Sequence, residues 1–139
     1  MSQGGLRGAI IPDLPPEEGR TYLDAMHAHQ LAPILIFSPT TSLDRMATIS
    51  ASGSGFIYCV ARKGVTGEAT DFSEELAGYL RRCRKGTSFP LALGFGIKEK
   101  SDIDFLKGKA DIAVIGSQTI RVMEQKGVAA VENFIRGLR

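Results

Sequence analysis

Glycine-rich turns that follow short apolar runs are the residues of this 139-residue sequence best suited to chemistry. Gly94-Phe95-Gly96 and Gly116-Ser117 follow two such runs, and Gly64-Val65-Thr66-Gly67 follows a third. A phosphate group needs backbone N–H donors at close range, and glycine lets the main chain approach without a Cβ in the way. A helix that begins directly after the turn adds unpaired N–H groups and the positive end of its dipole. The pattern predicts a phosphate site, with ordinary strand-end turns as the alternative.

Isolated side chains near the ends of apolar runs are further candidates. Tyr58 lies in an aromatic and β-branched run, where packing is the alternative role. Asp13 follows the first run, where it is either functional or a turn or cap residue, and Arg62 either orients the loop after it or is a solvated charge. His27 and His29 are two positions apart on one predicted helix, so they do not share a face and are expected at the surface.

The elements that would position these residues alternate along the chain. Apolar runs predict strands over residues 6–11, 32–37, 55–61, 89–93 and 111–115. Amphipathic stretches predict helices over 17–29, after a Ser42 cap, and over 73–84, 99–107 and 118–138, with a break near Gly127. Glu17 and Glu18 are near the start of the first helix, where the helix dipole favours acids. Five continuous apolar strands that alternate with helices indicate a parallel sheet covered by helices.

Two α/β architectures fit this order, and the turns favour one of them. The sequence has no GxGxxG or GxxxxGK[ST] motif of a nucleotide-binding open sheet. In (β/α)₈ barrels, phosphate is commonly bound by the loops after the last two strands. A whole barrel takes about 250 residues. We therefore expect a single partial TIM-barrel domain over residues 1–139, with 1–5 as a flexible leader, and self-association through the open sheet edges.

Composition excludes several other classes. The net charge is only +2, no cluster of basic and aromatic residues suggests a nucleic-acid face, and no apolar run approaches the roughly 18 residues of a membrane span. The N-terminus lacks the features of a secretory signal. Cys59 and Cys83 form no CxxC motif, and Cys59 is expected to be a core thiol. A disulfide between the two is the alternative, but the composition favours a reducing cytoplasm. We expect no metal site.

Taken in order, five segments resemble the tryptophan synthase alpha subunit family. They are Ile11-Pro12-Asp13-Leu14-Pro15-Pro16-Glu17-Glu18, Phe56-Ile57-Tyr58, Arg62-Lys63-Gly64-Val65-Thr66-Gly67, Gly94-Phe95-Gly96-Ile97 and Gly116-Ser117. The resemblance runs from about Gly8 onward. The first and third segments are the most specific, because Gly-Phe-Gly and Gly-Ser occur in several phosphate-binding barrels.

The resemblance implies a lyase of tryptophan biosynthesis that cleaves indole-3-glycerol phosphate in a retro-aldol reaction to indole and glyceraldehyde 3-phosphate. It places Tyr58 near the reacting end of the substrate and Thr66 in a closing loop. It implies that Asp13 and Pro15 face a beta subunit, which carries pyridoxal phosphate, and that this chain has no cofactor of its own. The expected substrate-binding residues are Tyr58, Thr66, Gly67, Phe95, Gly96, Gly116 and Ser117.

The match corresponds to barrel strands four to eight, and the family's catalytic Glu and Asp belong to the part that is not matched. Retro-aldol cleavage needs proton transfers, so this chain alone is expected to be inactive. A non-catalytic phosphate-ester-binding half-barrel and an inert fragment are the alternatives. Another phosphate-binding barrel enzyme, such as an isomerase, would lack the Arg-Lys-Gly-Val-Thr-Gly stretch.

Overall fold

The computed structural model describes residues 1–61, 74–94 and 96–139, and it contains one five-stranded sheet in those residues. The strands are β1 (Gly8–Ile10), β2 (Ala32–Phe37), β3 (Ile57–Val60), β4 (Leu91–Gly94) and β5 (Ile112–Ala113). They lie in chain order, and every neighbouring pair is parallel. The prediction of five parallel strands that alternate with helices is confirmed.

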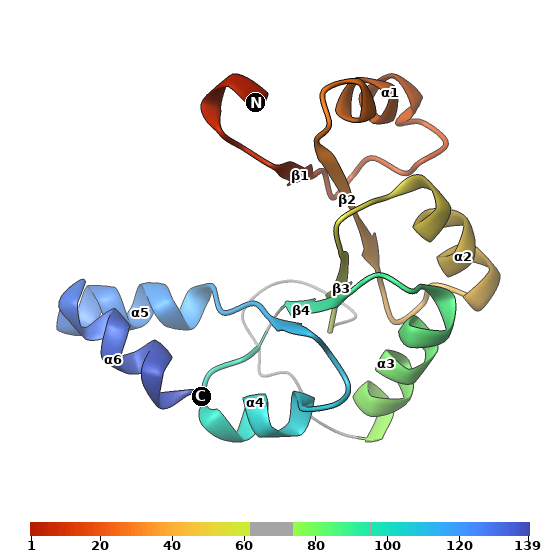
Figure 1. The fold of residues 1–139 in the computed structure, drawn as a ribbon. Coiled ribbons are helices and arrows are strands. Elements are labelled where there is room, and N and C mark those ends of the chain that lie inside the picture. Colours follow the sequence, from red (N-terminus) through yellow and green to blue (C-terminus); the bar gives the residue numbers. More distant parts are fainter. Residues whose placement is uncertain (62–73, 95) are drawn as a thin grey trace.

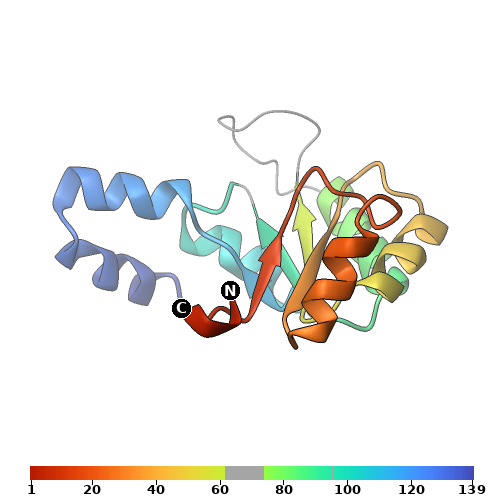
Figure 2. The ribbon, with the colours of Figure 1, turned by 90° about the horizontal axis from the view of Figure 1, so that it is seen from above.

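Helices α1 to α4 connect successive strands, and α5 and α6 follow the last strand. They are α1 (Arg20–Ala28), α2 (Leu43–Ser52), α3 (Glu74–Gly86), α4 (Lys100–Leu106), α5 (Ser117–Lys126) and α6 (Ala129–Gly137), after a short 3₁₀ helix η1 (Ser2–Gly4). Figure 1 shows α1 to α4 in an arc around the sheet. By contrast, α5 and α6 extend away from it as a pair, which the view from above in Figure 2 also shows.

The hydrophobic core lies between this arc of helices and the middle of the sheet. Along β2, Pro33, Leu35 and Phe37 are buried while the alternate residues are only half-buried, because successive side chains of a strand point to opposite faces. The same alternation places Ile57 and Cys59 of β3 in the core. The core cluster comprises Leu35, Phe37, Met46, Ile49, Ile57, Cys59, Leu76, Tyr79, Leu80, Cys83, Leu91, Leu93, Ile97 and Leu106.

Helix ends follow the sequence signals at two of three places. The Ser42 hydroxyl accepts a hydrogen bond from the Arg45 N–H (3.3 Å), which confirms the predicted cap of α2. Gly127, at φ +81°, ends α5 and confirms the predicted break. The helix expected from residue 17 begins only at Arg20, because the Glu18 and Gly19 N–H groups donate to the Pro15 carbonyl in a tight turn.

Both cysteines are buried and free, so the thiol role predicted for Cys59 is confirmed and the alternative of a disulfide is wrong for this structure. The neighbouring Cys83 thiol and burial raise the pKa of Cys59 above its usual range. His27 and His29 are exposed on α1, as predicted. In the described ranges no helix has the length and apolar character that crossing a bilayer requires.

Candidate functional site

Two of the three predicted phosphate turns follow neighbouring strands at one edge of the sheet, and the third, residues 64–67, lies outside the described residues. Parallel pairing sets Ala92 opposite Ile112 and Leu93 opposite Ala113, and the Val114 N–H donates to the Leu93 carbonyl (2.9 Å). The turn after β4 and the turn after β5 therefore leave the sheet from neighbouring strands in the same direction. Gly96 therefore follows the strand that neighbours the one before Gly116 and Ser117.

Gly116 and Ser117 form an open helix start. Gly116 is the N-cap of α5, Ser117 is its first residue, and no side chain caps the helix. Both residues are exposed, and a Cβ added to Gly116 would meet no heavy atom within 4 Å. The first N–H groups of a helix have no partner within the helix, so this turn presents backbone donors and a positive dipole end to an anion.

Two glycines at the end of β4 are required by geometry. Gly96 has φ +89°, a conformation that favours glycine over any residue with a Cβ. Gly94 is buried, and a Cβ there would lie 1.7 Å from the Tyr58 hydroxyl oxygen. The Tyr58 ring therefore extends directly over the backbone of β4, where burial raises the pKa of its hydroxyl. Sequence reasoning treated Gly94 as a turn residue and missed this contact.

Three of the predicted substrate-binding residues cannot be placed. Thr66 and Gly67, and the Arg62 candidate, lie outside the described residues, as does Phe95. Of the other candidates, Tyr58 is on β3, Gly96 follows β4, and Gly116 and Ser117 follow β5 at the start of α5.

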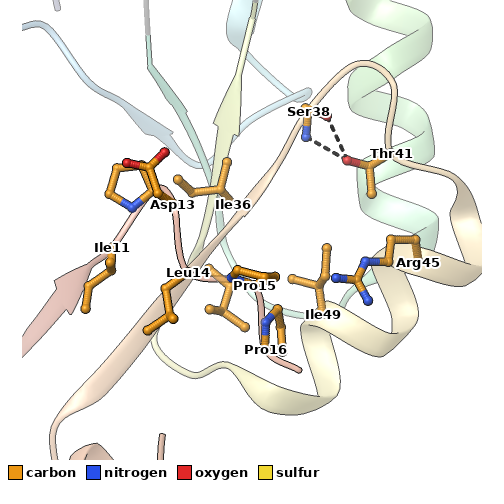
Figure 3. Close-up of a pocket in the computed structure, with 12 residues that line it drawn as sticks. Ile11, Asp13, Leu14, Pro15, Pro16, Ile36, Ser38, Thr41, Arg45 and Ile49 are labelled. Carbon is orange, nitrogen blue, oxygen red and sulfur yellow. Dashed lines mark hydrogen bonds between the residues drawn. The ribbon is translucent and has the colours of Figure 1, made fainter. Parts of the chain in front are cut away.

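Asp13 and Pro15 lie elsewhere, in the loop between β1 and α1. This loop forms one wall of a hollow of about 320 Å³, whose other wall comes from the end of β2 and from α2. Figure 3 shows Leu14, Pro15 and Pro16 near Ile49, with Asp13 farther along the loop. The lining residues are Ile11, Pro12, Asp13, Leu14, Pro15, Pro16, Leu35, Ile36, Ser38, Thr41, Arg45 and Ile49.

Ser38 and Thr41, on the β2 side of this hollow, form hydrogen bonds with each other. The Ser38 N–H donates to the Thr41 hydroxyl (3.0 Å), and the Ser38 and Thr41 hydroxyl oxygens are 2.9 Å apart (Figure 3). A hydroxyl that folds back on its own turn fixes the end of the strand. The hollow is therefore mainly an apolar surface with a rigid rim.

An ion pair joins the two walls. The Arg45 guanidinium donates to both carboxylate oxygens of Glu17, and the Nη2–Oε2 distance is 2.7 Å. The hydrogen bond from Arg45 lowers the pKa of Glu17 to about 2. We expected Glu17 to stabilise the first turn of a helix, and that interpretation is wrong, because α1 has no acidic residue in its first turn. The two residues are 28 positions apart in the sequence, so no local pattern predicts that they pair.

None of the described strands β3, β4 and β5 carries an acidic residue, and the acids that follow Gly96, Glu99 and Asp102, form the capping box of α4. Asp111 stands at the opposite end of β5, where its carboxylate accepts from the Leu91 N–H (2.7 Å) and from Arg84. Those bonds lower its pKa, so it serves as a structural anion. No group of three or more His, Cys, Asp or Glu in residues 1–61, 74–94 and 96–139 is arranged to bind a metal ion.

Comparison with known proteins gives one consistent result. A family model described as tryptophan synthase alpha chain matches residues 1–136. A tryptophan synthase alpha chain from Syntrophotalea carbinolica is 60% identical over 139 residues, which is 100% of this chain and 55% of that protein.

Solved structures agree with the sequence match. A Mycobacterium tuberculosis tryptophan synthase structure has a TM-score of 0.85 at 26% identity, covering 99% of this chain and 51% of the other. A Pyrococcus furiosus tryptophan synthase α2β2 complex shares the fold, with a TM-score of 0.82 at 24% identity over 99% and 56% of the two chains. The chain spans about half the length of the relatives that it matches.

Proposed function

This chain belongs to the tryptophan synthase alpha chain family, and we propose that it corresponds to barrel strands four to eight and binds the phosphate of indole-3-glycerol phosphate. The observation that carries this proposal is the uncapped, exposed start of α5 at Gly116-Ser117, beside the turn that contains Gly96. Backbone donors, a helix dipole and space for an anion coincide there.

The proposed roles follow from the geometry of this edge. The N–H groups of Gly116, Ser117 and Gly96, with the Ser117 hydroxyl, hold the phosphate. Tyr58, which extends over β4 from the neighbouring strand, lies toward the reacting end of the substrate. Thr66, Gly67 and Phe95 complete the proposed site from outside the described residues.

The proposed reaction is a retro-aldol cleavage. The bond between the indole ring carbon and the glycerol phosphate side chain breaks, the ring carbon gains a proton, and a glycerol hydroxyl loses one to become the aldehyde of glyceraldehyde 3-phosphate. Both proton transfers need a positioned acid or base. Within the described residues the glycine-rich edge has no carboxylate on β3, β4 or β5 at the strands' C-terminal ends. We therefore expect substrate binding without turnover by this chain alone.

Ligand calorimetry with glycerol 3-phosphate tests the site. Ser117→Asp places a carboxylate where the phosphate is proposed to bind, so binding should be lost, while an acid in the first turn favours the helix. Ser42→Asp makes the same charge change at the start of α2 and should leave binding unchanged. Equal binding by both variants, or none by the parent chain, would contradict the proposal.

A non-catalytic phosphate-ester-binding half-barrel is the second candidate, and the lack of a carboxylate on the described strands β3, β4 and β5 favours it for the isolated chain. The discriminating measurement is indole release from indole-3-glycerol phosphate. Binding with no indole released supports the half-barrel, and release of indole by the isolated chain supports a complete catalytic site.

Partners are also part of the proposal. Asp13 is exposed and Pro15 half-buried in the loop between β1 and α1, which suits contact with a beta subunit that carries pyridoxal phosphate. This chain needs no cofactor of its own for the proposed reaction, and the cytoplasm is the proposed compartment. Where β1 and β5 are uncovered, the edges of the sheet are proposed to pair with another chain.

A further inference from the structure

Among the described residues, the backbone hydrogen bonds of the loop between β1 and α1 are local. The Leu14 N–H donates to the Ile11 carbonyl (3.4 Å), and the Glu18 and Gly19 N–H groups donate to the Pro15 carbonyl (3.1 and 3.0 Å). Pro12, Pro15 and Pro16 have no N–H to donate. Backbone hydrogen bonding therefore shapes the loop internally but does not fix its position against α2.

The Glu17–Arg45 ion pair links the loop to α2. Arg45 lies in the first turn of α2, where its N–H is bound by the Ser42 cap, and its guanidinium forks onto both oxygens of Glu17. Paired N–H···O bonds of this kind constrain orientation as well as distance. Arg45 and Ile49 come from the same helix and face Pro15 and Pro16 across the hollow (Figure 3).

We propose that Glu17 and Arg45 are positioning residues that hold the loop bearing Asp13 and Pro15 in the conformation that a beta subunit contacts. The identity of the partner rests on the proposed function, whereas the Glu17–Arg45 pair that holds the loop, here named the clamp, does not. The pair bridges two segments 28 positions apart, and it does so beside the hollow that those segments share. Exposed ion pairs are usually weak, so the expected effect is about two- to fivefold in the population of the displaced loop.

Amide hydrogen exchange by NMR tests the clamp in the chain as it stands. Glu17→Gln and Arg45→Met should each speed exchange at the Glu18 and Gly19 amides about two- to fivefold, and the double variant should add nothing further. The charge-swapped pair Glu17→Arg with Arg45→Glu should restore most of the protection. Glu132→Gln breaks a different exposed ion pair, with Arg136 on α6, and should leave these amides unchanged. Unchanged exchange in both single variants would overturn the clamp.

Affinity for a tryptophan synthase beta subunit tests the consequence. Both single variants should weaken binding by a factor similar to that seen in exchange, and the charge-swapped pair should recover it. Faster exchange with unaltered affinity would overturn the positioning role. If the parent chain itself does not bind a beta subunit, the partner part of the proposed function fails, whereas the exchange experiment still decides the clamp.

Discussion

The middle of the sheet and its C-terminal end are built from the same βα unit, yet they differ in what they bury. All four residues of β4 are buried and α3 contributes five buried residues, whereas both residues of β5 are exposed and α5 and α6 contribute none. Ile112, Ile120, Met123 and Val128 are apolar and exposed in this end region. A βα unit needs neighbours on both sides to bury its apolar surface, and the last unit has only one.

The largest expected effect comes from truncating a buried apolar side chain in the middle of the sheet, compared with an exposed one at the C-terminal end. Leu80 on α3 is 1% exposed and Ile120 on α5 is 52% exposed. Leu80→Ala should cost about 2–5 kcal/mol in the free energy of unfolding, because it removes contacts and leaves a cavity. Ile120→Ala should change it by less than about 0.5 kcal/mol. Urea denaturation measures both, and similar costs at the two positions would break the comparison.

The second largest effect is expected at Gly94, because the Tyr58 side chain leaves no room there for a Cβ. Gly94→Ala should destabilise the chain by about 1–3 kcal/mol, since the new Cβ would overlap the Tyr58 hydroxyl. Adding Tyr58→Ala removes the obstructing side chain, so the double variant should cost less than the sum of the two single changes. If the changes in the free energy of unfolding measured in urea were strictly additive, the two residues would not be in steric contact.

The oligomeric state of the chain tests whether the C-terminal end of the sheet pairs with another copy. If β5 and the apolar face of α5 pair with another copy, the chain should exceed 14.9 kDa in light scattering. Ile112→Lys should then shift it toward the monomer, because a charge on an edge strand opposes pairing. The matched change Leu43→Lys, at an apolar residue 44% exposed on α2, should not. A clean monomer in the parent chain would mean that these edges do not associate.

The smallest expected effect concerns pH. The pKa of Glu17 is lowered from 4.5 to about 2, so the ionised carboxylate favours the folded state above pH 4.5. That contribution should decline as pH falls from about 4.5 toward 2, when the folded state's Glu17 takes up its proton. An NMR titration of the Glu17 carboxyl carbon measures this pKa directly. A midpoint near 4.5 would show that the ion pair does not persist in solution.

Sequence patterns predicted the central elements well and the ends less well. The bounds of β2 match the apolar run over 32–37, because a strand with two neighbours is apolar along its whole length. The run over 111–115 yields only Ile112–Ala113, since β5 pairs on one side alone. The start of α1 was placed too early because acidic residues suit a helix N-terminus and a tertiary ion pair equally well.

The candidate site was predictable to the extent that local chemistry defines it. The glycine turns and the Ser117 helix start could be predicted, because backbone conformation and strand order alone bring them together. The Tyr58–Gly94 contact and the Glu17–Arg45 pair could not, because they depend on strand register and on how a loop folds over α2. Whether Thr66, Gly67 and Phe95 join the site stays a prediction.

An NMR titration with glycerol 3-phosphate tests whether the turns after β4 and β5 bind phosphate. We expect saturable shifts of the Gly96, Gly116 and Ser117 amides, with the Gly53 and Gly86 amides at the other end of the helices unmoved. Shifts spread over the chain, or none at the three site amides, would contradict the proposed phosphate site.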